Sequence, residues 1–153
     1  MDQIALLAPV PEEHLISALD TQKSAGKVAF GSNAWQVFNE LREIAGDQEI
    51  DVYIYASDSR KFGPPKVRWT ARYLGHVDSK NGAHPSGMTY RPTSTEQYDA
   101  DNRGHWAVFW EVDSLVELTK DEAIPMNLLS GRNSHKAFVS NFVPHGPTLI
   151  EAL

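Results

Sequence analysis

Basic and aromatic side chains are concentrated in one short stretch, residues 60–72. This stretch contains Phe62 and Trp69, no acidic residue, and five basic ones: Arg60, Lys61, Lys66, Arg68 and Arg72. The other nine basic residues of the chain are outnumbered by twenty acidic ones. Cations hold phosphate groups, and aromatic rings stack on nucleobases. The stretch therefore indicates contacts with a nucleic-acid backbone, and a solvated strand face that balances nearby acids is the alternative.

A second group of candidates consists of aromatic side chains on strands that we expect to be neighbours. These are Tyr55, Trp69, Trp106 and Trp110. They fit either an aromatic core or a pocket that sandwiches a planar ligand, an aromatic cage to which Ser57 at the end of its strand would add a polar contact. The long irregular stretch 78–105 adds Tyr90 and Arg91 as ligand-binding candidates, because loops of this length in compact domains are commonly binding loops.

Catalytic and metal-binding patterns are scarce. The phosphate-binding loop, the dinucleotide-binding glycine pattern and the nucleophile elbow are all absent, as is a paired-histidine zinc helix. The chain has six histidines and no cysteine, so we predict neither a metal nor a cofactor. The enzymatic alternative is a small hydrolase or lyase acting on a nucleoside-like molecule, with His84 or His105 as general base near Asp101 or Glu111. A protein-interaction module using the long loop is a further alternative, and we favour a non-enzymatic protein.

Charge and composition limit the partners. A formal net charge of −6 disfavours indiscriminate binding to phosphate backbones, so a nucleic-acid site would have to be local. A chain of 153 residues suits a single domain. Its first residues lack the basic region of a signal peptide, and no apolar run approaches the roughly 20 residues that span a bilayer. We therefore expect a soluble, cytoplasmic protein with no membrane partner.

Hydrophobic periodicity predicts an α+β fold. The runs 52–56 and 107–112 are apolar on both faces, which predicts central strands covered on both sides. Further strands are expected at 4–8, 27–31, 66–77, 137–143 and 149–151, and helices at 11–23 and 33–45. Cover on both faces is supplied by a twisted sheet of five to seven strands, mainly antiparallel, that curls toward a barrel.

The order of these elements resembles the EVE-like members of the PUA-like superfamily. The resemblance covers roughly residues 27–143. It rests on an Asp-x-Tyr-x-Tyr-x-Ser strand from Asp51, an Arg-Trp-x-Ala-x-Tyr strand from Arg68, a long loop, a Trp-rich strand and an Ile-Pro-x-x-Leu-Leu segment from Ile124. Residues 1–26 would be an N-terminal strand and helix added to a single domain of residues 1–153.

This resemblance implies a curved pseudo-barrel sheet with flanking helices and a pocket walled by aromatic residues at its mouth. Several members of the family bind modified bases in nucleic acids. Tyr55, Ser57, Trp69 and Trp106 are the pocket residues that the resemblance implies in this chain. The expected partner is accordingly DNA or RNA with a modified base. The Gly-x-Lys-x-x-Glu-x-Arg signature of the related ASCH-type domains is absent, which argues against their RNA-processing or amidohydrolase activities.

Overall fold

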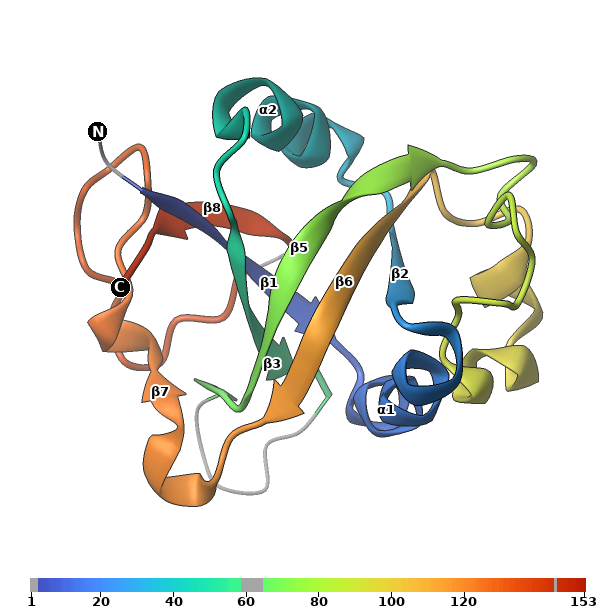
Figure 1. Cartoon of the computed structure of the whole chain (residues 1–153). Coiled ribbons are helices and arrows are strands. Elements are labelled where there is room, and N and C mark those ends of the chain that lie inside the picture. The colour runs from blue at the N-terminus through green and yellow to red at the C-terminus, as the bar shows by residue number, and fades with distance from the viewer. Residues whose placement is uncertain (1–2, 59–64, 145) are drawn as a thin grey trace.

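A mixed six-stranded sheet forms the centre of the computed structural model, which describes residues 3–58, 65–144 and 146–153 (Figure 1). The strand order is β2-β6-β5-β3-β1-β8. The strands are β1 (Ile4–Val10), β2 (Val28–Ser32), β3 (Asp51–Ala56), β5 (Trp69–Asp78), β6 (Val108–Glu117) and β8 (Thr148–Glu151). Only the β1–β3 pair is parallel. The predicted α+β class and mainly antiparallel sheet are confirmed.

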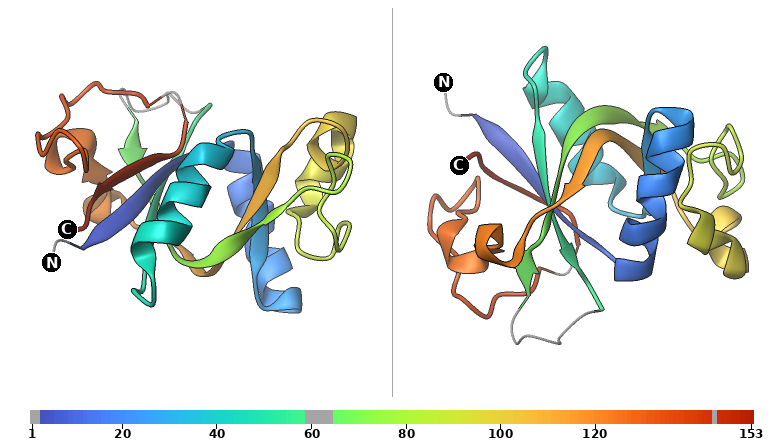
Figure 2. Two further views of the ribbon diagram at one scale, coloured as in Figure 1. Left: turned by 90° about the horizontal axis from the view of Figure 1, so that it is seen from above. Right: turned by 60° about the horizontal axis from the view of Figure 1, so that its bottom comes forward.

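The parallel pair follows from the connection between its strands. Helix α1 (Glu12–Ala25), strand β2 and helix α2 (Trp35–Ala45) lie between β1 and β3 in the sequence, and a long crossover of this kind is what parallel strands require. Gly26 ends α1 in the left-handed conformation, at φ 86°, where its N–H bonds the Gln22 carbonyl. Leu15 of α1 and Phe38 of α2 are buried in the same hydrophobic core, whereas Ile16 and Trp35 on these helices are exposed. The ribbon views show both helices beside the sheet (Figure 2).

The sheet carries a hydrophobic core on each face. The larger one contains Val52 and Ile54 of β3 together with the helices. The smaller one contains Tyr53 and Tyr55 and is covered by residues of the 118–142 segment such as Met126. The period-2 prediction for β3, apolar on both faces, is therefore confirmed.

The sheet is open, and the described residues form no closed barrel, because the edge strands β2 and β8 do not pair with each other. Both edges are capped by other segments. The Ala29 N–H of β2 donates to the Tyr90 carbonyl at 2.7 Å, and the Arg132 N–H donates to Leu149 of β8 at 3.2 Å. The caps satisfy backbone groups that a bare edge would offer to another chain.

Two local predictions need correction. The expected strand 66–77 is interrupted at Arg68, so that β4 (Lys66–Val67) leaves the main sheet and pairs with β7 (Ile124–Pro125). The expected strand 137–143 is wrong, since this segment contributes only an isolated bridge between Ala137 and Ser130. Its two phenylalanines, Phe138 and Phe142, stack at 4.4 Å over the smaller core. The composition of this segment resembles that of a strand, but the segment forms a turn that brings the two rings, four residues apart, into contact.

Short 3₁₀ helices complete the fold: η1 (Thr93–Gln97), η2 (Asp99–Asn102), η3 (Lys120–Glu122) and η4 (Met126–Leu128). Thr119 and Glu122 form a capping box at the start of η3. Among the described residues, no helix has the length and apolar character needed to cross a bilayer.

Candidate functional site

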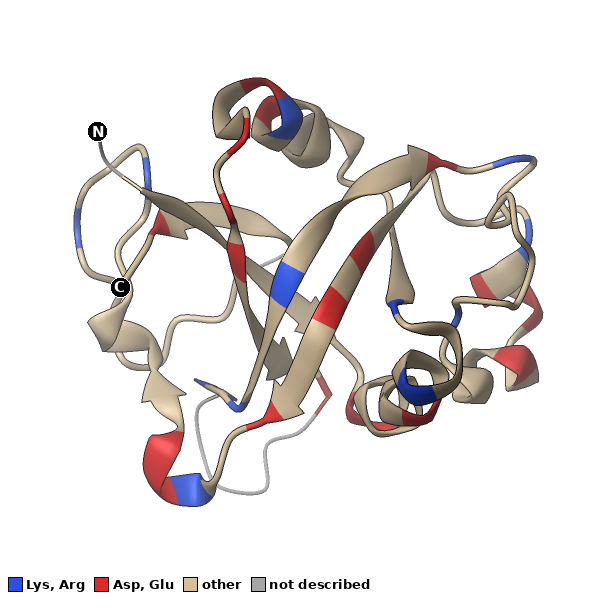
Figure 3. Cartoon of the chain, viewed as in Figure 1, with Lys and Arg blue, Asp and Glu red and all other residues tan. Residues whose placement is uncertain are grey.

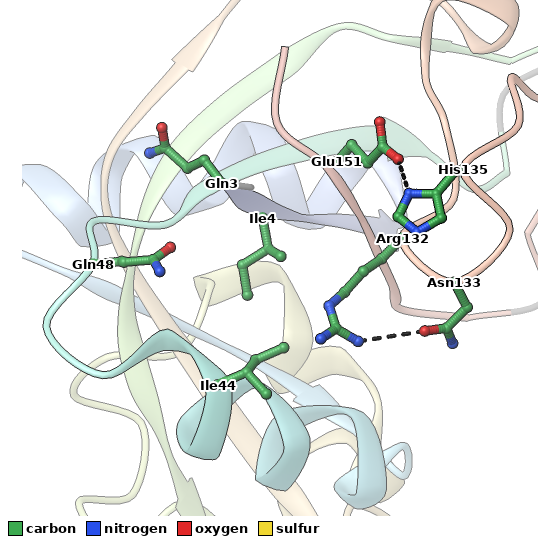
Figure 4. Close-up of a pocket in the computed structure, with 8 residues that line it drawn as sticks. All are labelled: Gln3, Ile4, Ile44, Gln48, Arg132, Asn133, His135 and Glu151. Carbon is green, nitrogen blue, oxygen red and sulfur yellow. Dashed lines mark hydrogen bonds and ion pairs between the residues drawn. The ribbon is translucent and has the colours of Figure 1, made fainter. Parts of the chain in front are cut away.

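A pocket of about 420 Å³ lies where the end of α2, the start of β1, β8 and the loop 131–136 meet (Figure 4). It is lined by Gln3, Ile4, Ile44, Gln48, Arg132, Asn133, His135 and Glu151. Antiparallel pairing of β1 with β8 sets Ile4 opposite Glu151 and so brings the two ends of the chain into one wall. Its size falls within the usual range for small-molecule sites.

One end of the pocket combines apolar faces with side-chain amides. Ile4 and Ile44 supply the apolar surface, and Gln3 and Gln48 lie beside them (Figure 4). The Oε1 atom of Gln48 is buried and has no hydrogen-bond partner within the described part of the chain. A buried acceptor left in this state costs about 1–3 kcal/mol. Because the terminal torsion of glutamine is soft, a rotation would present this oxygen to a molecule in the pocket.

The other end of the pocket is charged. His135 Nδ1 lies 2.5 Å from Glu151 Oε1, and Arg132 Nη1 bonds Glu40 Oε1 and Asn133 Oδ1, each at 3.3 Å. His135 adopts φ 56°, in the left-handed region that few non-glycine residues occupy. A carboxylate on one ring nitrogen orients the imidazole and leaves Nε2 for a second partner. This end can therefore bind a polar or charged group.

The structure does not bring Tyr55 and Trp69 into one cage. Tyr55 is 1% exposed in the smaller core and donates through its hydroxyl to the Pro144 carbonyl at 2.8 Å, whereas Trp69 is 2% exposed in the larger core across the sheet. Trp110 is also a core residue, between Phe30 and Phe38. Ser57 is half-buried beyond the end of β3, and its N–H donates to the Val10 carbonyl.

Tyr90, Arg91 and Trp106 lie in a different region, against β2. The ring of Trp106 rests on Gly31, where an added Cβ would come within 2.4 Å of it, and its Nε1 donates to Asp101 Oδ1 at 3.0 Å. Tyr90 is half-buried with the Lys27 ammonium 4.5 Å from its ring centre. These side chains attach the 84–106 segment to the sheet.

Arg91, the charged residue among these three, is 2% exposed. Its guanidinium donates to the Ala29 carbonyl, the Asp101 carbonyl and Asn102 Oδ1, at 2.9, 2.9 and 3.0 Å. Burial lowers the pKa of Arg91 to about 10, and the nearby Asp101 carboxylate acts in the opposite direction. The guanidinium also lies over the Phe109 ring. Arg91 is thus bonded on all sides by protein groups.

Two of the five expected phosphate-binding residues are engaged within the protein. Arg72 forms a bidentate pair with Asp113, both distances 3.1 Å, and half-buried Arg68 donates twice to the Leu118 carbonyl. Lys66 is exposed, and Arg60 and Lys61 lie outside the described residues. Figure 3 shows acidic positions along β6 beside the basic position of β5. The charge of Arg72 is therefore balanced by Asp113, whereas Arg68 is held by a neutral carbonyl.

Of the two histidines considered as general bases, His84 is buried beside Glu111. Its Nε2 lies 3.1 Å from Glu111 Oε2, and its Nδ1 accepts the Ser86 N–H. Lys27 Nζ bonds the other carboxylate oxygen at 3.2 Å. Both ring nitrogens of His84 are therefore occupied. His105 is exposed and lies edge-to-face against Trp106.

Stability should fall at acid pH as Glu111 takes up a proton. The hydrogen bond from His84, assisted by Lys27, lowers the pKa of Glu111 below its ordinary value in spite of burial. A carboxylate whose pKa is depressed by folding contributes fully above its unfolded pKa, near 4.3, and loses that contribution as the pH falls through the folded value. Glu111→Gln should cost about 1–3 kcal/mol at pH 7 and far less near pH 2. Urea denaturation at both values checks this, and an equal cost at the two would contradict it.

Sequence reasoning missed one further cluster, between α1 and η1. His14 Nδ1 lies 2.6 Å from Ser94 Oγ, and His14 Nε2 lies 3.5 Å from Asp101 Oδ2. The Ser94 hydroxyl also lies 2.7 Å from Ser17 Oγ. His14 is 7% exposed and the two serines are half-buried, and their contacts fasten α1 to the loop.

Compared with models of known families and with curated proteins, the chain matches neither. The site must therefore be judged by its own geometry. The pocket of Figure 4 draws its residues from four separate segments, none of which carries a motif, and among the described residues no three metal-ligating side chains gather into a metal site.

Proposed function

We propose that this chain is a PUA-like module that binds a nucleobase in the pocket between α2, β1, β8 and the loop 131–136. The observation that carries the proposal is Oε1 of Gln48, which has no hydrogen-bond partner among the described residues and lies in the wall of a pocket with two isoleucines. A base offers N–H donors at its edge and flat faces for apolar contact. The sequence resemblance to base-binding domains supports a base as the ligand, but the pocket residues that it implies are different ones.

Recognition in this pocket would depend on the base edge. Side-chain amides pair with base edges because they offer a donor and an acceptor side by side, the pattern by which asparagine and glutamine read adenine. Gln3 and Gln48 supply two such amides, and Ile4 and Ile44 would contact the faces of the ring. The aromatic residues predicted as walls are not needed in this arrangement, since Tyr55 and Trp69 lie in the two cores.

The proposed macromolecular partner is DNA or RNA with a flipped, modified base. Extruding a base from a duplex costs a few kcal/mol, and a modified or unpaired base costs least. With Arg72 held by Asp113 and a net charge of −6, few phosphates would be neutralised. Binding to an oligonucleotide should therefore weaken only slightly with added salt, unlike that of proteins that rely on many phosphate contacts.

Replacing Gln48 by leucine tests the base pocket directly. We expect Gln48→Leu to weaken base binding about tenfold or more, in line with the 1–3 kcal/mol of a well-formed base-edge contact. Its thermal stability should stay the same or rise, because the unpartnered amide is gone. The measurement is a calorimetric titration with nucleosides and with short strands holding modified and unmodified bases, next to a melting curve.

Gln36→Leu is the matched control, because Gln36 is an exposed glutamine of helix α2, outside the pocket. It should bind as the parent does. A Gln48→Leu protein that is folded and binds every nucleoside and strand with the parent affinity would overturn the proposed site.

A further inference from the structure

We propose that the charged end of the same pocket is a phosphate subsite formed by Arg132, Asn133 and His135, so that the ligand is a nucleoside monophosphate group. This inference rests on the proposed function, because it takes the base to lie between the isoleucines. A phosphomonoester of this kind occurs on a free mononucleotide and at the phosphorylated end of a strand.

The three side chains present polar atoms that their internal contacts leave unused. Within the described part of the chain, the Arg132 guanidinium donates two hydrogen bonds, and both use Nη1. Its Nε and Nη2 therefore remain as donors. Asn133 accepts through Oδ1, so its amide nitrogen remains a donor. His135 is held at Nδ1 by Glu151, which leaves Nε2 of its ring for a ligand. Figure 4 shows the guanidinium extending into the space between Ile44 and Asn133.

The loop that holds these groups is fixed by its own backbone. The Gly131 N–H donates to the Lys136 carbonyl at 3.2 Å, and the His135 N–H donates to the Gly131 carbonyl at 2.9 Å. The Arg132 N–H continues the edge of β8 through Leu149. A subsite whose donors are already positioned loses less conformational entropy when it binds.

Two carboxylates lie beside the cations of the subsite, so an anionic ligand has to displace one of them. Glu151 of β8 pairs with His135, and Glu40 of α2 pairs with Arg132 at 3.3 Å, where the two side chains are 48% and 33% exposed. Exposed pairs of this kind contribute little, so a phosphate can replace Glu40 on the guanidinium. Arginine binds phosphate through two parallel N–H groups, which is stronger and more directional than a single contact. The pocket also has room beyond a base alone, since sites of 300–1,000 Å³ hold drug-sized ligands.

The test is a calorimetric comparison of nucleosides with their 5′-monophosphates. The probes are adenosine, cytidine, guanosine, uridine, N6-methyladenosine and 5-methylcytidine, each with its monophosphate, together with inorganic phosphate. For a base that binds, the monophosphate should bind the parent about tenfold more tightly than the nucleoside. Arg132→Gln should remove this difference, because it should weaken binding of the monophosphate far more than binding of the nucleoside. Lys136→Gln, an exposed cation of the same loop, is the control and should keep the difference.

The outcomes separate this inference from the proposed function. If a nucleoside binds and its monophosphate binds no better, the phosphate subsite is overturned and the base pocket stands. If inorganic phosphate and all monophosphates bind alike, lose binding in Arg132→Gln, and no nucleoside binds, the base pocket is overturned and the subsite stands. If none of the probes binds, both are overturned. Strands with and without a 5′-phosphate then distinguish a free nucleotide from a strand end. If the ligand is a strand end, the phosphorylated strand should bind as tightly as the mononucleotide. If the ligand is a free nucleotide, the phosphorylated strand should bind more weakly.

Discussion

Replacing Arg91 by leucine should destabilise the protein by about 3–5 kcal/mol, the usual cost of breaking a buried charge network by removing one partner. The guanidinium gives hydrogen bonds to Ala29, Asp101 and Asn102 and is 2% exposed. Leucine leaves these oxygens buried without donors, and it leaves Asp101 without its counter-charge. The cap on the edge of β2 should therefore open.

Urea denaturation followed by tryptophan fluorescence measures the effect. Arg103→Leu is the control, because Arg103 belongs to the same loop but its side chain is 75% exposed and pairs with exposed Asp99. It should change the free energy of unfolding by less than about 0.5 kcal/mol. A loss below 1 kcal/mol in Arg91→Leu would contradict the structural role and return Arg91 to the ligand-binding candidates.

The position of Arg91 in the sequence gave a misleading signal. It lies in a long polar loop, where an arginine is ordinarily exposed and available for recognition. Its burial depends on the loop folding back over the edge of β2, with the Ala29 N–H paired to the Tyr90 carbonyl. This is a contact across about sixty residues, and no local pattern encodes it.

The central strands were predictable because burial on both faces leaves a continuous apolar run in the sequence. The run at 52–56 predicted β3, and the run at 107–112 predicted the first half of β6. The apolar runs do not determine the pairing register of the strands. Ile54 pairs with Trp69, which places Trp69 on the face of Ile54 and Tyr55 on the opposite one. A shift of one residue would have put both aromatic rings on the same side, as the cage hypothesis required.

The pocket residues had no sequence signal for a related reason. Gln3, Gln48, Arg132 and His135 come from segments that meet only because β1 pairs with both β3 and β8. Each is an ordinary polar residue in its own context. The pocket is therefore a product of the topology, and only the three-dimensional structure reveals it.

Trp69→Ala separates the two accounts of where a base would bind. Trp69 is 2% exposed within the larger core, and truncating a buried tryptophan costs about 3–5 kcal/mol through lost contacts and the cavity that remains. We expect this loss of stability with unchanged affinity for nucleosides, because the pocket lined by Gln48 and Ile44 lies elsewhere. The measurements are a denaturation curve and a calorimetric titration below the melting temperature.

Trp106→Ala is the companion variant, because Trp106 is half-buried and lies against Gly31 of β2, at the edge of the sheet opposite to β8. It should lose less stability than Trp69→Ala and should also bind nucleosides as the parent does. If either variant remains as stable as the parent but loses nucleoside binding, the aromatic side chain contacts the base. The cage hypothesis would then replace the pocket between α2, β1 and β8.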